Sequence, residues 1–469
     1  MKKLSAASLG LAIAASTLLS GCVSSGFNNS DLLRPPRTTG DKAEIQELIE
    51  QNAGGDYTLK YPKDGSYRSA IINEDLDGDS VDEAIVFYRP STDDESTHLL
   101  FLKEINGEWE DVGDYSSPSS EVKKVEIGDI TGDSKNEVIV GWTDKSESVC
   151  TLSVYTIGEK TTAEMTVDES CSQFLLADMT GEGRNSLMLF SLSMQNIDAN
   201  AKMLQYDVQS KKLFTRSSVA MSNSANSFMD LKFGSISEEQ SGVFVDTLSV
   251  SREGETQFIY WNEAESSLVN PLNTQNGAAS SNPTFRASDD IVSTDINDDG
   301  IVELPILSRM PHTSNENIDL VAFLSEWNHY DPSSDEMTEV FEAVTNPEMG
   351  YYFIIPDEWK DIVTARYSLF GNSLTFYIWN EPQSNDDEDN NDEQPAEEAT
   401  ESEGGVGDKL LTIQVFAAEE WTRSQNSEFI EIGSYGDSVY AVNIPEDSSV
   451  TGEIAMSLNK IPEYFYLIN

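Results

Sequence analysis

The chain has 469 residues, and 83 aspartates and glutamates against 29 lysines and arginines give it a formal net charge of −54. This balance leaves no basic surface to neutralise phosphates, which excludes nucleic-acid binding and purely electrostatic attachment to anionic lipids. With 38% hydrophobic residues the chain can still bury a core, and its length corresponds to about three domains.

The chain begins with an export signal. Two lysines precede an apolar run over residues 4–19, which is too short to span a bilayer. The sequence Leu19-Ser20-Gly21-Cys22 that follows resembles the bacterial lipobox. The resemblance implies a lipoprotein signal peptide over residues 1–21 and acyl chains, palmitate among them, on Cys22, which would anchor the protein to the extracytoplasmic face of the cell membrane. An ordinary signal peptide with a coincidental cysteine is the alternative.

A flexible tether and a helix come next. Residues 22–40 are rich in serine, asparagine, glycine and proline, as flexible linkers are. The periodicity over residues 41–53 predicts a short amphipathic helix with Asp41 as its N-cap and with Ile45 and Ile49 on one face. We expect this helix to pack on the domain that follows.

An acidic motif then recurs at intervals of about 50 to 60 residues, which is the repeat length of a propeller blade with about four short strands. Apolar, strand-like segments lie before and after each copy. The copies occupy residues 75–87, 129–140, 178–190, 233–245 and 295–306, and the fourth has lost most of its acidic residues.

These repeats resemble the FG-GAP and VCBS repeats found in the head of the integrin α-chain, over roughly residues 65 to 345. The resemblance implies a mainly β fold in which a β-propeller, with the short helix before it, spans residues 41–345. It also implies a calcium loop between the first two strands of a blade. Five copies are recognisable where the family usually has seven blades, so the number of blades, up to seven, and the closure of the ring stay open.

The spacing of the oxygen-bearing residues suits calcium, which takes six to eight oxygen ligands in flexible geometry. Positions one, three, five and nine supply side chains, and position seven supplies a backbone carbonyl. The predicted ligands are Asp75, Asp77, Asp79, Val81 and Glu83 in the first copy, Asp129, Thr131, Asp133, Lys135 and Glu137 in the second, and Asp295, Asn297, Asp299, Ile301 and Glu303 in the fifth. We expect weak binding or none in the third and fourth copies. The alternative is that the motifs are merely good hairpin turns.

Two cysteines remain after export, Cys150 and Cys171. An oxidising compartment would allow them to form a disulfide, but two buried free thiols are an equal alternative. They do not form a zinc site, because no further cysteine or histidine lies near them at ligand spacing.

The sequence pattern changes after the repeats. The pattern of residues 346–469 predicts a small β-rich α+β domain. Its opening segment, residues 353–360, looks like the start of a domain that follows such repeats in clostridial-type lipoproteins. The acidic stretch 381–408 predicts a disordered loop. Strands are expected near 362–369, 373–379, 409–417, 428–432 and 438–444, with an αβ ending over 449–469.

No metalloprotease, nucleophile-elbow, phosphate-loop or dinucleotide motif occurs in the sequence. Its three histidines, His98, His312 and His329, leave few candidates for triad or zinc chemistry, and His312 and His329 are interpreted as surface residues. We therefore expect a non-catalytic, lipid-anchored binding module with structural calcium that binds an envelope protein or a glycan. An enzyme or enzyme accessory acting on extracellular polysaccharide or peptide is the alternative. A third hypothesis makes the propeller a spacer and the C-terminal domain the part that binds the partner.

Overall fold

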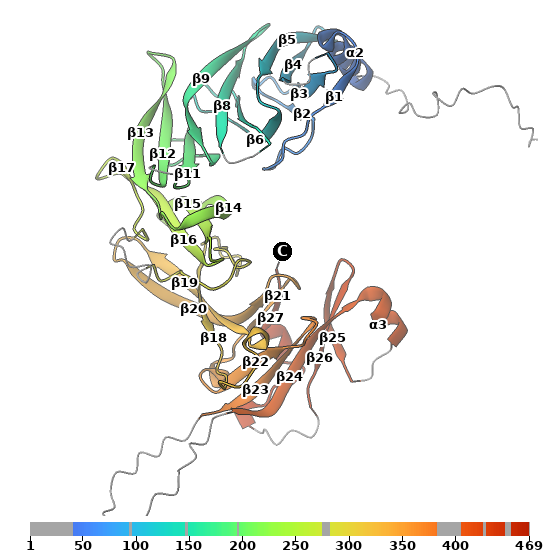
Figure 1. Ribbon diagram of the computed structural model, residues 1–469, viewed down its shortest axis with the longest axis vertical. Helices are drawn as coiled ribbons and strands as arrows, with labels where there is room; N and C mark the ends of the chain where they lie inside the picture. The colour runs from blue at the N-terminus through green and yellow to red at the C-terminus, as the bar shows by residue number, and fades with distance from the viewer. Residues whose placement is uncertain are drawn as a thin grey trace, which may run out of the picture.

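The computed structural model describes residues 41–92, 96–145, 149–194, 197–273, 282–381, 405–424, 428–445 and 452–468. The fold is mainly β, and six antiparallel sheets follow one another along an arc that is open on one side (Figure 1). The predicted signal peptide, the tether, Cys22 and most of the acidic loop lie outside the described residues. No helix in the described part of the chain is long and apolar enough to cross a membrane.

The predicted helix is confirmed as α2 (Asp41–Ala53). Its apolar side, formed by Ile45, Ile49 and Ala53, is buried against Val86 and Leu100 of the first sheet. The helix therefore packs on the sheet that immediately follows it in the chain.

The first four sheets are built in chain order from up-and-down strands, as propeller blades are. The first contains β2 (Ile71–Glu74), β3 (Glu83–Pro90), β4 (Thr97–Ile105) and β5 (Glu108–Ser117), with β1 (Tyr57–Leu59) also paired to β3. The second contains β6 (Glu121–Gly128), β7 (Glu137–Thr143), β8 (Cys150–Ile157) and β9 (Thr162–Cys171). The third contains β10 (Gln173–Ala177), β11 (Ser186–Ser191), β12 (Asn200–Asp207) and β13 (Lys212–Ala220). The fourth contains β14 (Ala225–Ser235), β15 (Ser241–Ser249), β16 (Gly254–Asn262) and β17 (Ser267–Val269).

The fifth sheet joins the repeats to the C-terminal region. It contains β18 (Leu304–Arg309), β19 (Phe323–Asp331), β20 (Glu336–Asn346), β21 (Tyr351–Ile354) and, at its edge, β27 (Phe465–Leu467). Because β21 pairs with β20, the domain boundary expected after residue 345 falls inside this sheet.

The sixth sheet is formed by the C-terminal region alone. Its strands are β22 (Val363–Tyr367), β23 (Ser373–Asn380), β24 (Gly405–Ala417), β26 (Ser438–Asn443) and β25 (Ile430–Tyr435), in that order across the sheet. The remaining helices of the described residues are α3 (Ala418–Ser424) and the 3-10 turns η1 (Ile318–Leu320), η2 (Asp357–Trp359), η3 (Gly452–Ile454) and η4 (Ile461–Glu463).

Two details of the C-terminal prediction are wrong. Residues 405–408, expected in the acidic loop, belong to β24, because Gly405 and Val406 pair with Asn380 and Trp379 of β23. The ending was expected to be αβ, but its described part has only short 3-10 turns before β27. The helix α3, after β24, was not predicted.

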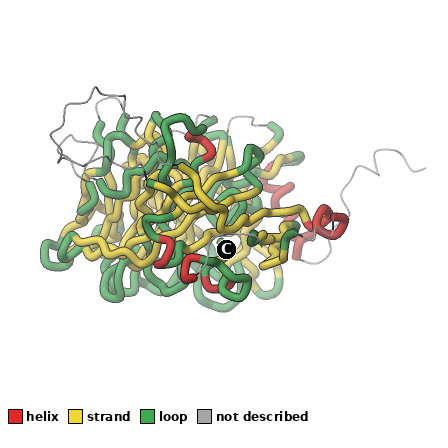
Figure 2. Tube along the Cα trace, turned by 90° about the horizontal axis from the view of Figure 1, so that it is seen from below, coloured by secondary structure: helices red, strands yellow, loops and turns green. Residues whose placement is uncertain are grey.

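The core is divided among the interfaces between successive sheets, so the middle strands are buried on both faces. In β3, Ile85 and Phe87 face the second sheet, whereas Ala84 and Val86 face α2. A helix thus covers the outer face of the first sheet, and no strand pairing joins the first sheet to the sixth among the described residues. Loops gather along both rims of the arc, with the strands between them (Figure 2).

Candidate cation-binding loops

The repeats occupy the same place in successive sheets. The first loop (residues 75–83) joins β2 to β3, the second (129–137) joins β6 to β7, and the third (178–186) joins β10 to β11. The fourth copy is the tight hairpin between β14 and β15. The fifth loop (295–303) precedes β18 and is closed by a bridge between Thr294 and Glu303. The first three loops therefore lie between the first two strands of a sheet, as the family resemblance implies, whereas the fifth loop has only the Thr294–Glu303 bridge in place of the strand before it.

The first aspartate of each acidic loop shapes the turn. The carboxylate of Asp75 accepts hydrogen bonds from the amides of Gly78 and Ser80, at 2.8 and 2.9 Å. Asp129 accepts from the amides three and five residues further on in the second loop, and Asp295 accepts from those of Asp299 and Gly300 in the fifth. Ser80 has positive φ, which is unfavourable for a residue other than glycine, and the hydrogen bond from its amide to Asp75 stabilises this turn.

The last glutamate of each loop closes it from inside. Glu83, Glu137 and Glu303 are all buried, and each accepts a hydrogen bond of 2.9 to 3.0 Å from the amide of the second loop residue. Burying a carboxylate in this way is costly unless a cation or further donors compensate it. The neighbours of each glutamate therefore decide what the loop can bind.

The loops are also connected to one another. The amide of Asn136 in the second loop donates to the carbonyl of Leu76 in the first, at 2.8 Å, and its side chain donates to the carbonyl of Asp75. The amide of Asn185 in the third loop donates to the carbonyl of Asp129 in the second, at 3.0 Å. The asparagine before the closing position thus couples each of these loops to the preceding sheet.

In four of the sheets, a residue on the strand that follows the loop's closing strand lies directly opposite the closing residue of the loop. In the first sheet this partner is Lys103, one position beyond the paired Ala84 and Leu102. The equivalent residues are Thr156, Gln205 and His329 in the second, third and fifth sheets. This position controls the charge beside the closing residue, and its role was not predicted from the sequence.

In the first loop the partner is a buried ammonium group. The Nζ atom of Lys103 contacts Asp77 and lies 3.0 Å from Glu83 Oε1 and 3.5 Å from Asp79 Oδ2. Burial by itself lowers the pKa of Lys103, but its contacts with Asp77 and Glu83 outweigh that effect and hold the pKa above the ordinary lysine value. Lys103 thus supplies a cation to this loop. Within the described residues, Oδ1 of Asp77 is nevertheless buried without a hydrogen-bond partner.

In the fifth loop the partner is a histidine. His329 Nε2 lies 3.0 Å from Glu303 Oε1 and 3.6 Å from Asp299 Oδ2. The amide of Asn297 lies 3.0 Å from the same two oxygen atoms. Burial raises the pKa of Glu303, and the contacts with Ile296 and His329 oppose that shift. Asp299, Glu303 and His329 bring one ligand atom each to within 4.8 Å of one another, as Asp75, Asp77 and Glu83 do in the first loop.

The second loop has no such cation. Glu137 accepts hydrogen bonds from Ile130 and from Thr131, and no basic side chain in the described part of the chain pairs with it. Burial raises the pKa of Glu137 to about 7, with a further contribution from Asp133, although the two backbone hydrogen bonds oppose the shift. Asp129, Asp133 and Glu137 do not form one of the close groups found among the described residues.

The remaining copies carry less charge. In the third loop Ser186 replaces the closing glutamate and accepts a hydrogen bond of 3.2 Å from Gln205. The fourth copy is closed by backbone pairing of Ser235 with Ser241. Neither has a buried carboxylate at the closing position.

Cys150 and Cys171 lie opposite each other in the register of β8 and β9, and their buried sulfur atoms are 3.2 Å apart. Contact with Cys171 lowers the pKa of Cys150, whereas contact with Cys150 and burial raise that of Cys171. A disulfide needs an S–S distance of about 2.0 Å, which a small movement would provide.

We expect the pair to oxidise in an oxidising environment and to add about 3 kcal/mol to the free energy of unfolding. In a Cys22→Ser background, oxidised protein should show no free thiol after denaturation, and dithiothreitol or Cys171→Ser should remove the added stability. Two reactive thiols in the denatured, oxidised protein would contradict this prediction.

Comparisons with known proteins give only distant structural similarity. No family model matches the sequence, and no curated protein matches it. An exo-β-1,3-galactanase from Phanerochaete chrysosporium aligns at 10% identity over 70% of this chain and 80% of that one, with a TM-score of 0.29. Sqt1 from Saccharomyces cerevisiae aligns at 10% identity over 80% and 98% of the two chains, with a TM-score of 0.30. The Dos1 propeller aligns at 12% identity over 67% and 65%, with a TM-score of 0.28. Nothing about function transfers from these proteins at this level of similarity.

Proposed function

We propose that this protein is a lipid-anchored, extracytoplasmic binding module that binds an envelope protein or a glycan. Its sheets would be blades of the FG-GAP and VCBS type, held rigid by their acidic loops. The observation that carries the proposal is the series of hydrogen bonds that links the first, second and third loops along the arc. Loops coupled in this way form a stiff scaffold, which suits recognition of a partner and needs no catalytic group.

Calcium is part of this proposal, and the fifth loop fits it best. Asp295, Asn297, Asp299 and Glu303 present side-chain oxygens, and Ile301 can add its carbonyl, which is a donor set of the kind calcium prefers. Asp299 and Glu303 lie close together without a lysine between them, which supports a cation there. The amide nitrogen of Asn297, which contacts both carboxylates, would turn away so that its oxygen could bind the ion. Bound calcium would neutralise the closing carboxylate. In the first loop calcium would compete with Lys103.

The lipid anchor rests on the resemblance of residues 19–22 to a lipobox. Acylation of Cys22 would hold a strongly acidic protein at a membrane that its charge cannot attract. The tether over residues 22–40 would leave the arc of sheets free to contact material beyond the membrane surface.

Sedimentation with cell envelopes tests the binding function. The full chain carrying Cys22→Ser, which cannot be acylated, should co-sediment saturably with envelopes of the producing organism, whereas an unrelated acidic protein should not. Loss of binding after protease treatment of the envelopes would identify a protein partner, and loss after periodate oxidation a glycan. Absence of saturable binding to untreated envelopes would overturn the proposal.

A further inference from the structure

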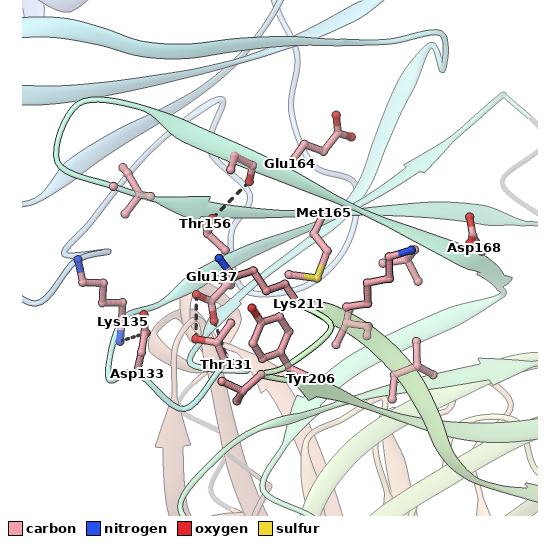
Figure 3. Close-up of a pocket in the computed structure, with 18 of the residues that line it drawn as sticks. Thr131, Asp133, Lys135, Glu137, Thr156, Glu164, Met165, Asp168, Tyr206 and Lys211 are labelled. Atoms are coloured by element: carbon pink, nitrogen blue, oxygen red, sulfur yellow. Dashed lines mark hydrogen bonds between the residues drawn. The ribbon is translucent and has the colours of Figure 1, made fainter.

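An open pocket of about 880 Å³ lies between the second and third sheets. It is lined by residues of β8 and β9 on one side and of β12 and β13 on the other, and the second loop forms one end (Figure 3). Figure 3 shows Glu137 beside Thr131 at that end, with Tyr206 and Thr156 around it and with the side chain of Lys211 extending toward it, although the two do not form an ion pair among the described residues. Five carboxylate side chains against three lysines line the pocket, so it favours cationic ligands.

In the first and fifth sheets, a basic side chain lies beside the buried carboxylate that closes the loop. Across from the closing residue, Lys103 brings an ammonium to 3.0 Å from Glu83, and His329 brings a ring nitrogen to 3.0 Å from Glu303. In the second sheet the equivalent residue is Thr156, whose short side chain carries no charge. Glu137 is only 2% exposed, yet no basic group of the described residues pairs with it. The second sheet has the buried carboxylate without the cation that accompanies it elsewhere.

We propose that this pocket binds the ammonium group of an unbranched alkylamine, placed beside Glu137 where Lys103 Nζ lies in the first sheet. A lysine side chain of a partner and a free diamine share this chemistry. The proposal is independent of the lipid anchor and of calcium in the fifth loop.

The walls of the pocket suit the stem of such a ligand. Ile157 and Leu204 are buried apolar residues that line it, and Met165, Tyr206 and Leu213 add half-buried surface. An alkyl chain lying on these side chains would lose water from its methylene groups while its charged end contacts the carboxylate. A divalent metal ion would gain nothing from this apolar wall.

Calorimetry on the full chain in calcium-free buffer tests the proposal with two probes, cadaverine and Nα-acetyl-lysine amide. Glu137→Gln should weaken binding of the amine about tenfold or more, because it removes a buried charge that the ammonium contacts. The matched control is Glu164→Gln, which removes an exposed charge from the same pocket and should change affinity less than about twofold. Nα,Nε-diacetyl-lysine amide, which has the same backbone but no ammonium group, should not bind.

Thr156→Lys provides the decisive variant, because its ammonium should fill the site from within. It should raise the melting temperature and abolish binding of both probes. Binding of cadaverine alone identifies a free diamine, and binding of the lysine amide identifies a lysine-bearing partner; both support the site. The proposal is overturned if neither probe binds the parent chain, if calcium alone binds through Glu137, or if Glu164→Gln weakens binding as much as Glu137→Gln. Should Thr156→Lys fail to fold, the Glu137→Gln and Glu164→Gln pair still decides the outcome.

Discussion

Replacing Asp246 by alanine is expected to lower the free energy of unfolding by about 3 to 5 kcal/mol, the usual cost of leaving one charge of a buried pair alone. Asp246, on β15, is fully buried and lies 2.7 Å from Nη2 of Arg286, which is also buried. Its carboxylate further accepts hydrogen bonds from the hydroxyls of Thr256 and Ser293, at 2.5 and 2.6 Å. Alanine would remove every one of these acceptors at once.

The network around Asp246 stabilises the fold because it holds an irregular segment, residues 282–293, in place. Arg286 also donates to the carbonyls of Thr284 and Ile291, and its backbone bridges Gly254 on β16. Residues 282–293 contain no strand, so the network takes the place of a sheet ladder in fixing them against the fourth sheet. Without Asp246 the guanidinium would have to stay buried without its counter-charge or pull the segment away.

Urea unfolding of the full chain and its variants would measure this loss. The matched control is Asp289→Ala, which breaks the nearby pair with the exposed Arg252 and should cost less than about 1 kcal/mol. The double variant Asp246→Leu with Arg286→Met should recover much of the loss, because it removes both buried charges. A loss below about 1 kcal/mol for Asp246→Ala would show that the pair does not fasten the segment.

The features predicted best from the sequence are those that depend only on residues close together in the chain. The acidic loops form where they were expected because aspartate and glycine at fixed spacing form the turn, whatever the rest of the chain does. The helix over 41–53 also follows from its own periodicity. That it covers the outer face of the first sheet, where a closed ring would place another blade, could not be predicted, since an amphipathic pattern does not say which surface it covers.

Contacts between distant residues escaped prediction for a related reason. Lys103 meets Glu83 only because β3 and β4 pair in one particular register, and a shift of one residue would turn the lysine to the opposite face. His329, interpreted as a surface residue, meets Glu303 through the register of β18 and β19. Arg286 and Asp246 do not belong to any recognisable sequence motif. Their contact could not be predicted, because the segment between them is partly irregular and has no repeating pattern that would set its register. The positions of the loops could therefore be predicted from the sequence. The basic side chain that lies beside the closing glutamate of a loop could not.

Lys103→Met should turn the first loop from a self-compensated loop into a calcium-dependent one. Methionine keeps most of the packing of the lysine stem but removes the ammonium from Asp77, Asp79 and Glu83. In calcium-free buffer the variant should lose about 3 kcal/mol or more of stability, since Glu83 would stay buried among like charges. Millimolar calcium should restore much of this loss, because an ion at about 10 to 100 times its dissociation constant adds about 1.4 to 2.7 kcal/mol.

Thermal and urea unfolding with and without calcium would test this prediction. The variant Asp299→Asn distinguishes the calcium response of the first loop from that of the fifth. The parent chain should respond to calcium through the fifth loop, so Asp299→Asn should abolish most of its response. Lys103→Met combined with Asp299→Asn should still respond, now through the first loop alone. If calcium stabilises Lys103→Met no more than it stabilises the parent, the first loop does not bind calcium even when the lysine is absent. Lys103 would then simply close the turn, and it would not take the place of a calcium ion. The sheets of this protein would then differ in the cation each one uses, with an ammonium in the first and a divalent ion in the fifth.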